Sequence, residues 1–200
     1  MESSSESIRR EVPFSEDRAL RADARRNFAA LVDAAKTVFA RSGVDAPAKE
    51  IADEAGVGVG TVYRRFPQRS DLVIAVFKQE VDACADAAAS LAAQNPPFAA
   101  LEQWLYRFSD FVATKHGLAQ ALHSGDPAFN ELPDYFRARF GPALTQLLDA
   151  ASAAKEIKAN ISADELLYAT ARLCRPIGDA GPDQSRRLVS LLISGLRSES

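Results

Sequence analysis

The stretch KEIADEAGVGVGTVYRRF, residues 49–66, predicts two short helices joined by a tight turn. The first helix has an apolar face because three residues recur at helical spacing: Ile51, Ala52 and Ala55. Gly56 follows, and a glycine ends a helix in the left-handed conformation without a Cβ clash. A second helical run is expected from about Val59 to Phe66. Two short helices that meet at such a turn are typical of helix-turn-helix motifs.

The second of these helices has an apolar back and a polar front. At about 100° per residue, the side chains on its back are Val59, Val62 and Phe66. Gly60 and Arg64 fall on the opposite side, with Thr61 and Arg65 on one flank and Tyr63 on the other. A cation, a glycine and hydrogen-bonding side chains on one short helix suit a recognition helix in a DNA major groove.

Two other interpretations of the same residues have to be weighed. Gly56, Gly58 and Gly60 suggest a phosphate-binding loop, but such a loop needs a preceding strand and, in a P-loop, a following lysine. The preceding IADEA is helical in composition, and Thr61 follows the last glycine. The second alternative is a plain helical hairpin with a solvated arginine pair. The position of that pair opposite an apolar face favours DNA binding.

The segment from Lys49 to Leu72, with GVGVGTVYRRFPQRSDL at its centre, resembles the DNA-binding domain of the tetracycline-repressor (TetR) family. That family shows a helix ending in I-A-x-x-A-G-V, a turn, the pattern T-[LV]-Y-x-[HRY]-F and a short basic link into a long helix. The match runs from about Phe28 to Phe77. Beyond it, only helical character and length agree.

The resemblance implies which residues meet DNA. Four residues are expected to face the groove: Gly60, Thr61, Tyr63 and Arg64. Three cations are expected nearer the phosphates: Lys49, Arg65 and Arg69. The implied partner is a double-stranded operator, which a two-fold symmetric protein would read as a near-palindrome.

The composition is that of an ordinary globular protein made of helices. The 200 residues are 47% hydrophobic and 26% charged, and they include only 10 glycines and 10 prolines. We expect an all-α fold of about nine helices. Its expected parts are a disordered tail over 1–20, a three-helix helix-turn-helix domain over 21–70, and a helical ligand-binding and dimerisation domain over 71–200.

The charge is unevenly divided along the chain. From Arg18 to Arg69 there are ten Lys and Arg against six Asp and Glu, a balance of +4. From Asp71 to the end there are twelve against sixteen, a balance of −4. A basic head on an acidic body fits nucleic-acid binding at one end and a different task at the other.

Other classes of site have no signature in the sequence. Cys84 and Cys174 lie far apart, without the spacing of a metal or disulfide site, so no metal is expected. The amino-terminal residues lack a signal-peptide core, and no run of about 18 apolar residues occurs. We therefore expect a cytoplasmic protein without a membrane partner. Because no recognised catalytic or cofactor motif occurs either, we expect no cofactor and no enzyme activity.

Beyond residue 70, aromatic side chains recur along the expected helices at 70–93, 98–115 and 131–154. They predict a small-molecule pocket, since such sites are mostly apolar with a few polar groups. The candidate ligand-binding residues are Phe77, Trp104, Phe108, Phe111, His116, Gln120, His123, Phe136 and Phe140. A cavity bordered by Trp104 and Phe108 is expected to take a neutral or weakly polar aromatic effector. The alternative is that these rings fill one another's space and form plain core.

The last two expected helices, 163–174 and 183–196, are amphipathic. By resemblance they dimerise the protein as a four-helix bundle, and the alternative is that they pack only on the body. The candidate interface residues are Leu167, Thr170, Leu188, Leu191, Leu192 and Gly195. The combined expectation is a homodimeric regulator, with repression released by a ligand; a ligand-independent DNA-binding dimer or a small helical enzyme are the alternatives.

Overall fold

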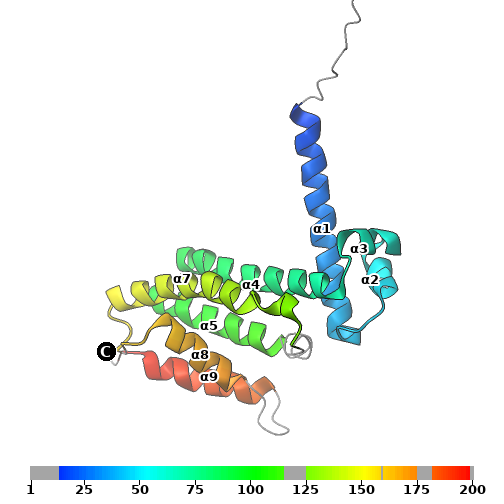
Figure 1. The fold of residues 1–200 in the computed structure, drawn as a ribbon. Coiled ribbons are helices and arrows are strands. Elements are labelled where there is room, and N and C mark those ends of the chain that lie inside the picture. The colour runs from blue at the N-terminus through cyan, green and yellow to red at the C-terminus, as the bar shows by residue number, and fades with distance from the viewer. Residues whose placement is uncertain (1–13, 115–124, 159, 175–181, 199–200) are drawn as a thin grey trace, which may run out of the picture.

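The structure is a computed structural model that describes residues 14–114, 125–158, 160–174 and 182–198. Within these ranges every extended element is helical: eight α-helices and one 3-10 helix, with no strand beyond an isolated bridge between Ile157 and Arg197. Figure 1 shows a small head of three helices attached to a bundle by one long helix. We call α1–α3 the head and α4–α9 the body. None of the described helices combines the length and the apolar character that a membrane span requires.

The head is built on the long helix α1 (Phe14–Ser42), against which α2 (Ala48–Ala55) and α3 (Val59–Arg65) pack. Its core is formed by the predicted apolar stripes, and its fully buried members include Val32, Ala35, Val38, Ile51 and Val62. Gly56 caps α2 in the left-handed conformation with φ 67° and ψ 31°. Its N–H donates to the Ala52 and Asp53 carbonyls, so the turn forms as the sequence predicts.

The start of α1 differs from the expectation. Helix α1 begins at Phe14, inside the segment 1–20 that we expected to be a disordered tail, because no glycine or proline interrupts the strong helix formers between Phe14 and Ser42. Helix α2 begins at Ala48, with Pro47 at the N-cap position and no side-chain cap.

Helix α4 (Arg69–Gln94) connects the head to the body (Figure 1). A capping box between Gln68 and Asp71 starts it, and the Ser70 side chain is buried. Helix α4 packs on α1 in the head and on α5 (Pro97–Thr114) and α7 (Leu132–Ala153) in the body. Its inner face is apolar along its length, from Leu72 to Ala88.

The body is completed by a short 3-10 helix η1 (Pro127–Phe129) and by α8 (Ala163–Leu173) and α9 (Pro182–Leu196). Ser162 caps α8, and the Glu165 side chain accepts in return from the Ser162 N–H, which completes a capping box. Pro142 lies inside α7, which continues through it. In Figure 1, α8 and α9 lie side by side on the side of the bundle away from α4, and α8 also packs on α7.

Candidate DNA-binding face and ligand cavity

Helix α3 turns its apolar back into the head and leaves its front open. Val62 is 2% exposed, and Phe66 directly after the helix packs against Phe28, with ring centroids 5.5 Å apart. On the front, Gly60 and Arg64 are exposed and Tyr63 is 58% exposed, while Thr61 is half-buried. Within the described part of the chain, Arg64 has no hydrogen-bond or ion-pair partner. The front of α3 therefore presents one available guanidinium, one phenol and a glycine that allows close approach.

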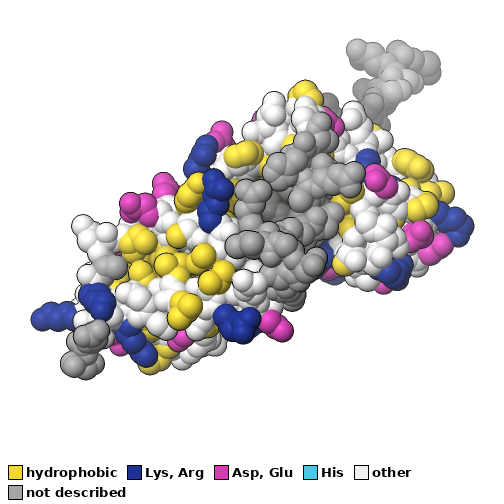
Figure 2. Space-filling view, turned by 90° about the horizontal axis from the view of Figure 1, so that it is seen from below, with side chains coloured by type: hydrophobic (Ala, Val, Ile, Leu, Met, Phe, Trp, Pro, Cys, Tyr) yellow, Lys and Arg dark blue, Asp and Glu magenta, His cyan; other side chains and the backbone are white. Residues whose placement is uncertain are grey.

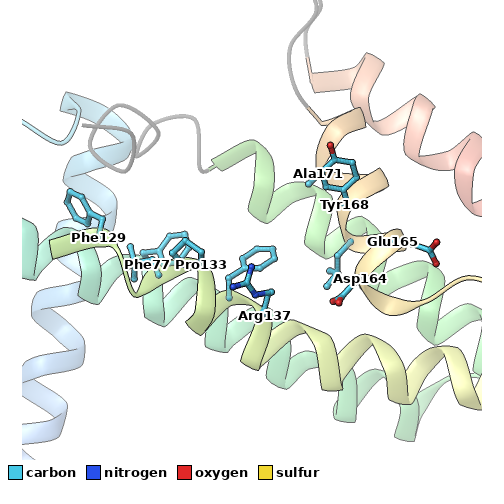
Figure 3. A pocket seen from close by; sticks show the side chains of 11 residues that line it. Phe77, Phe129, Pro133, Arg137, Asp164, Glu165, Tyr168 and Ala171 are labelled. Carbon is cyan, nitrogen blue, oxygen red and sulfur yellow. The ribbon is translucent and has the colours of Figure 1, made fainter. Parts of the chain in front are cut away.

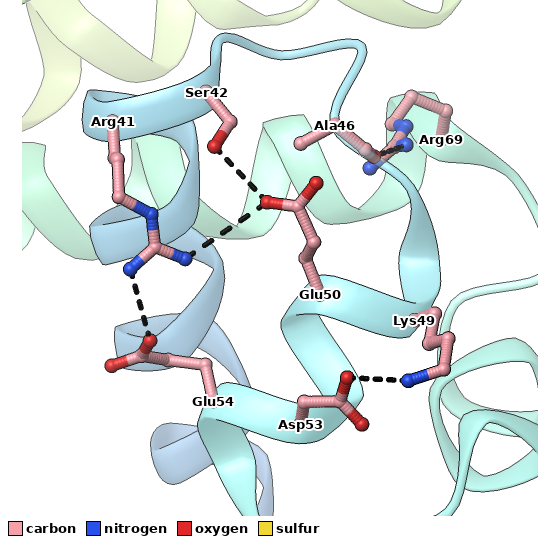
Figure 4. Close-up of polar contacts among 8 residues, drawn as sticks. All are labelled: Arg41, Ser42, Ala46, Lys49, Glu50, Asp53, Glu54 and Arg69. Carbon is pink, nitrogen blue, oxygen red and sulfur yellow. Dashed lines mark hydrogen bonds and ion pairs between the residues drawn. The ribbon is translucent and has the colours of Figure 1, made fainter.

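The three cations expected near phosphates are all engaged within the head (Figure 4 shows two of them). The Lys49 ammonium pairs with Asp53 one turn later at 2.7 Å, and this contact raises the pKa of Lys49. The Arg65 guanidinium lies 4.8 Å from the centre of the Phe28 ring, with its side chain still exposed.

Arg69 differs most from the expectation. It donates to the Ala46 carbonyl, and its guanidinium lies 5.7 Å from the centre of the Phe39 ring (Figure 4). This half-buried side chain ties the start of α4 to the loop before α2. It is therefore a structural link within the head, and its partner could not be predicted from residue types because that partner is a backbone carbonyl.

A cavity of about 660 Å³ lies in the body between α4, η1, α7 and α8 (Figure 3). Its apolar lining is contributed by Phe77, Phe129, Leu132, Pro133, Phe136, Leu167, Tyr168 and Ala171. Its charged lining residues are Arg137, Asp164 and Glu165. This volume and mixture lie in the usual range for small-molecule sites.

Two of the predicted ligand-binding residues, Phe77 and Phe136, line this cavity. Trp104, Phe108 and Phe140 do not: each is 0% exposed, and they pack against one another. The Trp104 and Phe108 rings are stacked with centroids 5.6 Å apart, and Phe140 meets both edge-on.

These three rings form core, as the alternative in the sequence analysis allowed, and the expectation that Trp104 and Phe108 border the cavity is corrected. Phe111 is also buried, against Phe77 and Phe140, and is not among the lining residues. His116, Gln120 and His123 lie outside the described residues.

Sequence reasoning missed the α8 side of the cavity because it assigned that helix to dimerisation. The signal was present: α8 has a broad apolar arc, in which Leu166 and Thr170 face the core while Leu167 and Ala171 turn to one side. An arc wider than one packing partner needs indicates a second contact surface. Phe129 and Pro133 carried no periodic signal, since they lie around the short η1 helix.

The predicted dimer-interface residues divide into two groups. Leu167 and Thr170 are buried within a single chain, at 4% and 0% exposure, so they are corrected to the cavity wall and the core. On α9 the core-facing residues are Val189, Ile193 and Leu196, which leaves the predicted stripe turned outward. Leu191 is 69% exposed, Gly195 is exposed, and Leu188 and Leu192 are half-buried.

Tyr168 on α8, at 62% exposure, adds a second large exposed apolar group to this side of the body. Figure 2 views the molecule from the side on which α8 and α9 lie, and hydrophobic side chains gather over that part of the body. We call Tyr168, Leu188, Leu191, Leu192 and Gly195 the outer α8–α9 face.

The buried titratable groups near the core show no sign of reactivity. Burial raises the pKa of the Cys84 thiol to about 12, so it stays protonated, and the Trp104 indole N–H donates to the Cys84 carbonyl at 2.9 Å. Burial likewise raises the pKa of Cys174. Among the described residues, no three His, Cys, Asp or Glu side chains come together in a way that would hold a metal ion.

Comparisons with known proteins cover most of the chain. Residues 31–76 match the family model "Bacterial regulatory proteins, tetR family", and residues 96–198 match "Transcriptional regulator SbtR-like, C-terminal domain". A TetR transcriptional regulator from Streptomyces coelicolor is 37% identical, covering 86% of this chain and 99% of its own, with a TM-score of 0.71. A TetR regulatory protein from Mycobacterium vanbaalenii is 33% identical over 90% of this chain and 99% of its own, with a TM-score of 0.69.

A more distant structure shares the fold. It is the transcriptional regulator FadR from Bacillus subtilis in complex with stearoyl-CoA, at 20% identity. It covers 84% of this chain and 99% of its own, with a TM-score of 0.56. No curated protein matches the chain.

Proposed function

Since the chain belongs to the TetR family of bacterial transcriptional regulators, we propose that it is a homodimeric repressor, released from a near-palindromic operator by a small effector with an apolar or aromatic body. The observation that carries the proposal is the front of α3. A short helix that exposes Gly60, Tyr63 and Arg64 while its back is buried has the form of a recognition helix. We expect Arg64 to contact a guanine, because a guanidinium matches the two acceptors of that base in the major groove.

The cavity between α4, α7 and α8 supports the effector part of the proposal. Its volume of about 660 Å³ is in the range of small-molecule sites. The same fold accommodates stearoyl-CoA in the FadR complex. A DNA-binding dimer without an effector would have no use for a cavity of this size, so the ligand-responsive function is favoured over the ligand-independent alternative.

A continuous set of contacts leads from the cavity to the head. Helix α7 lines the cavity with Phe136, and on its other side the Tyr135 hydroxyl donates to the Asp82 carboxylate of α4 at 2.7 Å. The same carboxylate accepts from Arg139 of α7 at 2.6 Å. A ligand that displaces α7 therefore also acts on α4.

Helix α4 passes this displacement to α1. The Gln79 amide donates to the Asp33 carboxylate at 2.6 Å, and the Lys36 ammonium pairs with Glu80 at 2.6 Å. In a dimer, a shift of α4 would change the separation of the two heads. The effector releases the operator only if it binds one head separation more tightly than the other, since equal affinity shifts no population.

The test is selection of binding sites by the full-length protein from a pool of random duplex DNA. The expected product is a near-palindrome with half-sites roughly one helical turn, about 34–36 Å, apart. Arg107→Ala, which removes an exposed cation from α5 in the body, is the matched control and should select the same site. Recovery of no preferred sequence, or of a single half-site, would contradict the proposal.

A further inference from the structure

The cavity between α4, α7 and α8 has two chemically different ends (Figure 3). At the end near η1, Phe77, Phe129 and Pro133 form an aromatic and aliphatic wall. At the other end, where α8 begins, Asp164 and Glu165 line the opening. An amphipathic molecule therefore has one orientation in which its apolar body and its polar group both find matching surroundings.

Of the three charged residues that line the cavity, two already have partners within the chain. Arg137 projects from α7 between the two ends, but it is paired with Asp134 one turn earlier. The Glu165 carboxylate accepts from the Ser162 N–H at 2.9 Å and from its hydroxyl at 2.7 Å, and these bonds lower the pKa of Glu165. Glu165 is thus ionised and already occupied by the helix cap.

Asp164 is the remaining lining charge. It is exposed, and within the described part of the chain it has no hydrogen-bond or ion-pair partner. The nearby Arg172 is directed elsewhere: its guanidinium lies 4.9 Å from the centre of the Tyr168 ring and donates to that hydroxyl, and Arg172 is not a lining residue. Among the described residues, no side chain pairs with the Asp164 carboxylate, so the polar end of the cavity carries one unpaired carboxylate at the amino-terminal end of α8.

From these contacts we propose that the cavity takes an amphipathic amine, with an aromatic or aliphatic body against Phe77, Phe129 and Phe136 and a protonated nitrogen at Asp164. The aromatic wall accepts ring ligands in offset or edge-on packing. A positive group at Asp164 gains attraction, whereas a carboxylate there meets like charge. This inference rests on the proposed function, because it takes the cavity to be the effector site.

Three probes of the same shape separate charge from size: 2-naphthylmethylamine, 2-naphthalenemethanol and 2-naphthoate. Calorimetric titration of each into the full-length protein at pH 7 should rank the amine first, the alcohol second and the carboxylate last. Because Asp164 is exposed to solvent, the advantage of the amine over the alcohol is expected to be about two- to five-fold.

Two variants locate the effect. Asp164→Asn should remove the advantage of the amine and leave the alcohol unchanged, while Asp149→Asn, an exposed carboxylate of α7 outside the lining, should change neither. Ala171→Phe places a ring in the cavity and should block all three probes. An amine preference that survives Asp164→Asn would overturn the assignment.

The other outcomes are equally decisive. Tightest binding by the carboxylate, lost in Arg137→Gln, would identify an anionic effector and overturn the proposal. Binding of none of the probes would overturn it too. Operator binding by the same preparations is measured separately: its loss contradicts the proposed function, whereas intact operator binding with no amine preference contradicts only the effector class.

Discussion

Arg64 is the side chain on which base recognition by α3 is expected to depend. It is exposed, and among the described residues it has no internal partner to give up on binding. A bidentate contact with guanine is worth about 1–3 kcal/mol of discrimination. Arg64→Ala should therefore weaken operator binding by about that amount and relax the sequence preference at one base pair in each half-site.

Fluorescence anisotropy with the selected operator and its single-base variants measures both effects of Arg64→Ala. Arg65→Ala is the matched control, because it removes the neighbouring cation, which lies over Phe28. It should weaken all sequences alike and leave the preference intact. An unchanged preference in Arg64→Ala would show that another residue of α3 reads the base.

For single residues, the sequence predicts which side chains are exposed better than it predicts which groups they contact. The periodicity of α3 placed Gly60, Tyr63 and Arg64 on its open face, which agrees with the structure. It did not predict that Arg69 would bind the Ala46 carbonyl, since a long side chain leaves no trace of its partner in a pattern of residue types. Nor did it separate Trp104 from Phe77, because an aromatic stripe looks the same in a core and beside a cavity.

Among the elements, α8 depends on a cap that also arranges the cavity. The Ser162 hydroxyl accepts from the Glu165 N–H, and Ser162→Ala should cost about 0.5–2 kcal/mol of stability. The contribution of Glu165 to the stability of the folded state depends on pH. Its pKa is lowered in the folded state, so its stabilisation is fully present above the ordinary value of 4.5 and is lost as the pH falls through the folded-state value.

Thermal unfolding of the wild type and of Glu165→Ala, followed from pH 7 down to pH 3, tests this cap. The difference in midpoint should be constant near neutrality and should shrink toward the acid end. Glu131→Ala is the control, because Glu131 occupies the N-cap of α7 without a side-chain cap bond. A difference that grows on acidification would refute the cap as the cause.

The sequence predicted which segments are helical better than it predicted where each helix begins and ends. Gly56 marked the end of a helix by known cap chemistry, and this agrees with the structure. The start of α1 was misplaced because a run of helix formers has no internal stop signal and charged composition was taken as disorder. The part that α8 has in the cavity was not predicted, since the cavity exists only after α7 and α8 pack.

For the whole molecule, the outer α8–α9 face gives the clearest test of assembly. Leu191 is 69% exposed and lies on the outward side of α9, whereas Val189 and Ile193 on the other side are buried in the core. Leu191→Glu should therefore leave the fold intact and convert the proposed dimer to a monomer. Operator affinity should fall steeply. In a dimer, binding of one head holds the second head near its half-site at a high effective concentration, and a monomer lacks this gain.

Light scattering coupled to size exclusion at micromolar concentration measures the mass of each variant. Gln146→Glu, on the exposed side of α7, introduces a carboxylate elsewhere in the body and should remain dimeric. A monomeric wild type would contradict the assembly directly. Leu192 is a poorer probe than Leu191, because it is half-buried and packs against the core of its own chain.

The placement of Trp104 gives the protein an intrinsic optical signal. It is the one tryptophan in the chain, it is 0% exposed, and its N–H is bound to a carbonyl of α4. An indole kept from water emits at shorter wavelength than a hydrated one, and movement of α4 away from α5 would break its hydrogen bond. The fluorescence emission of the native protein thus reports on the contact between α4 and α5, without an added dye.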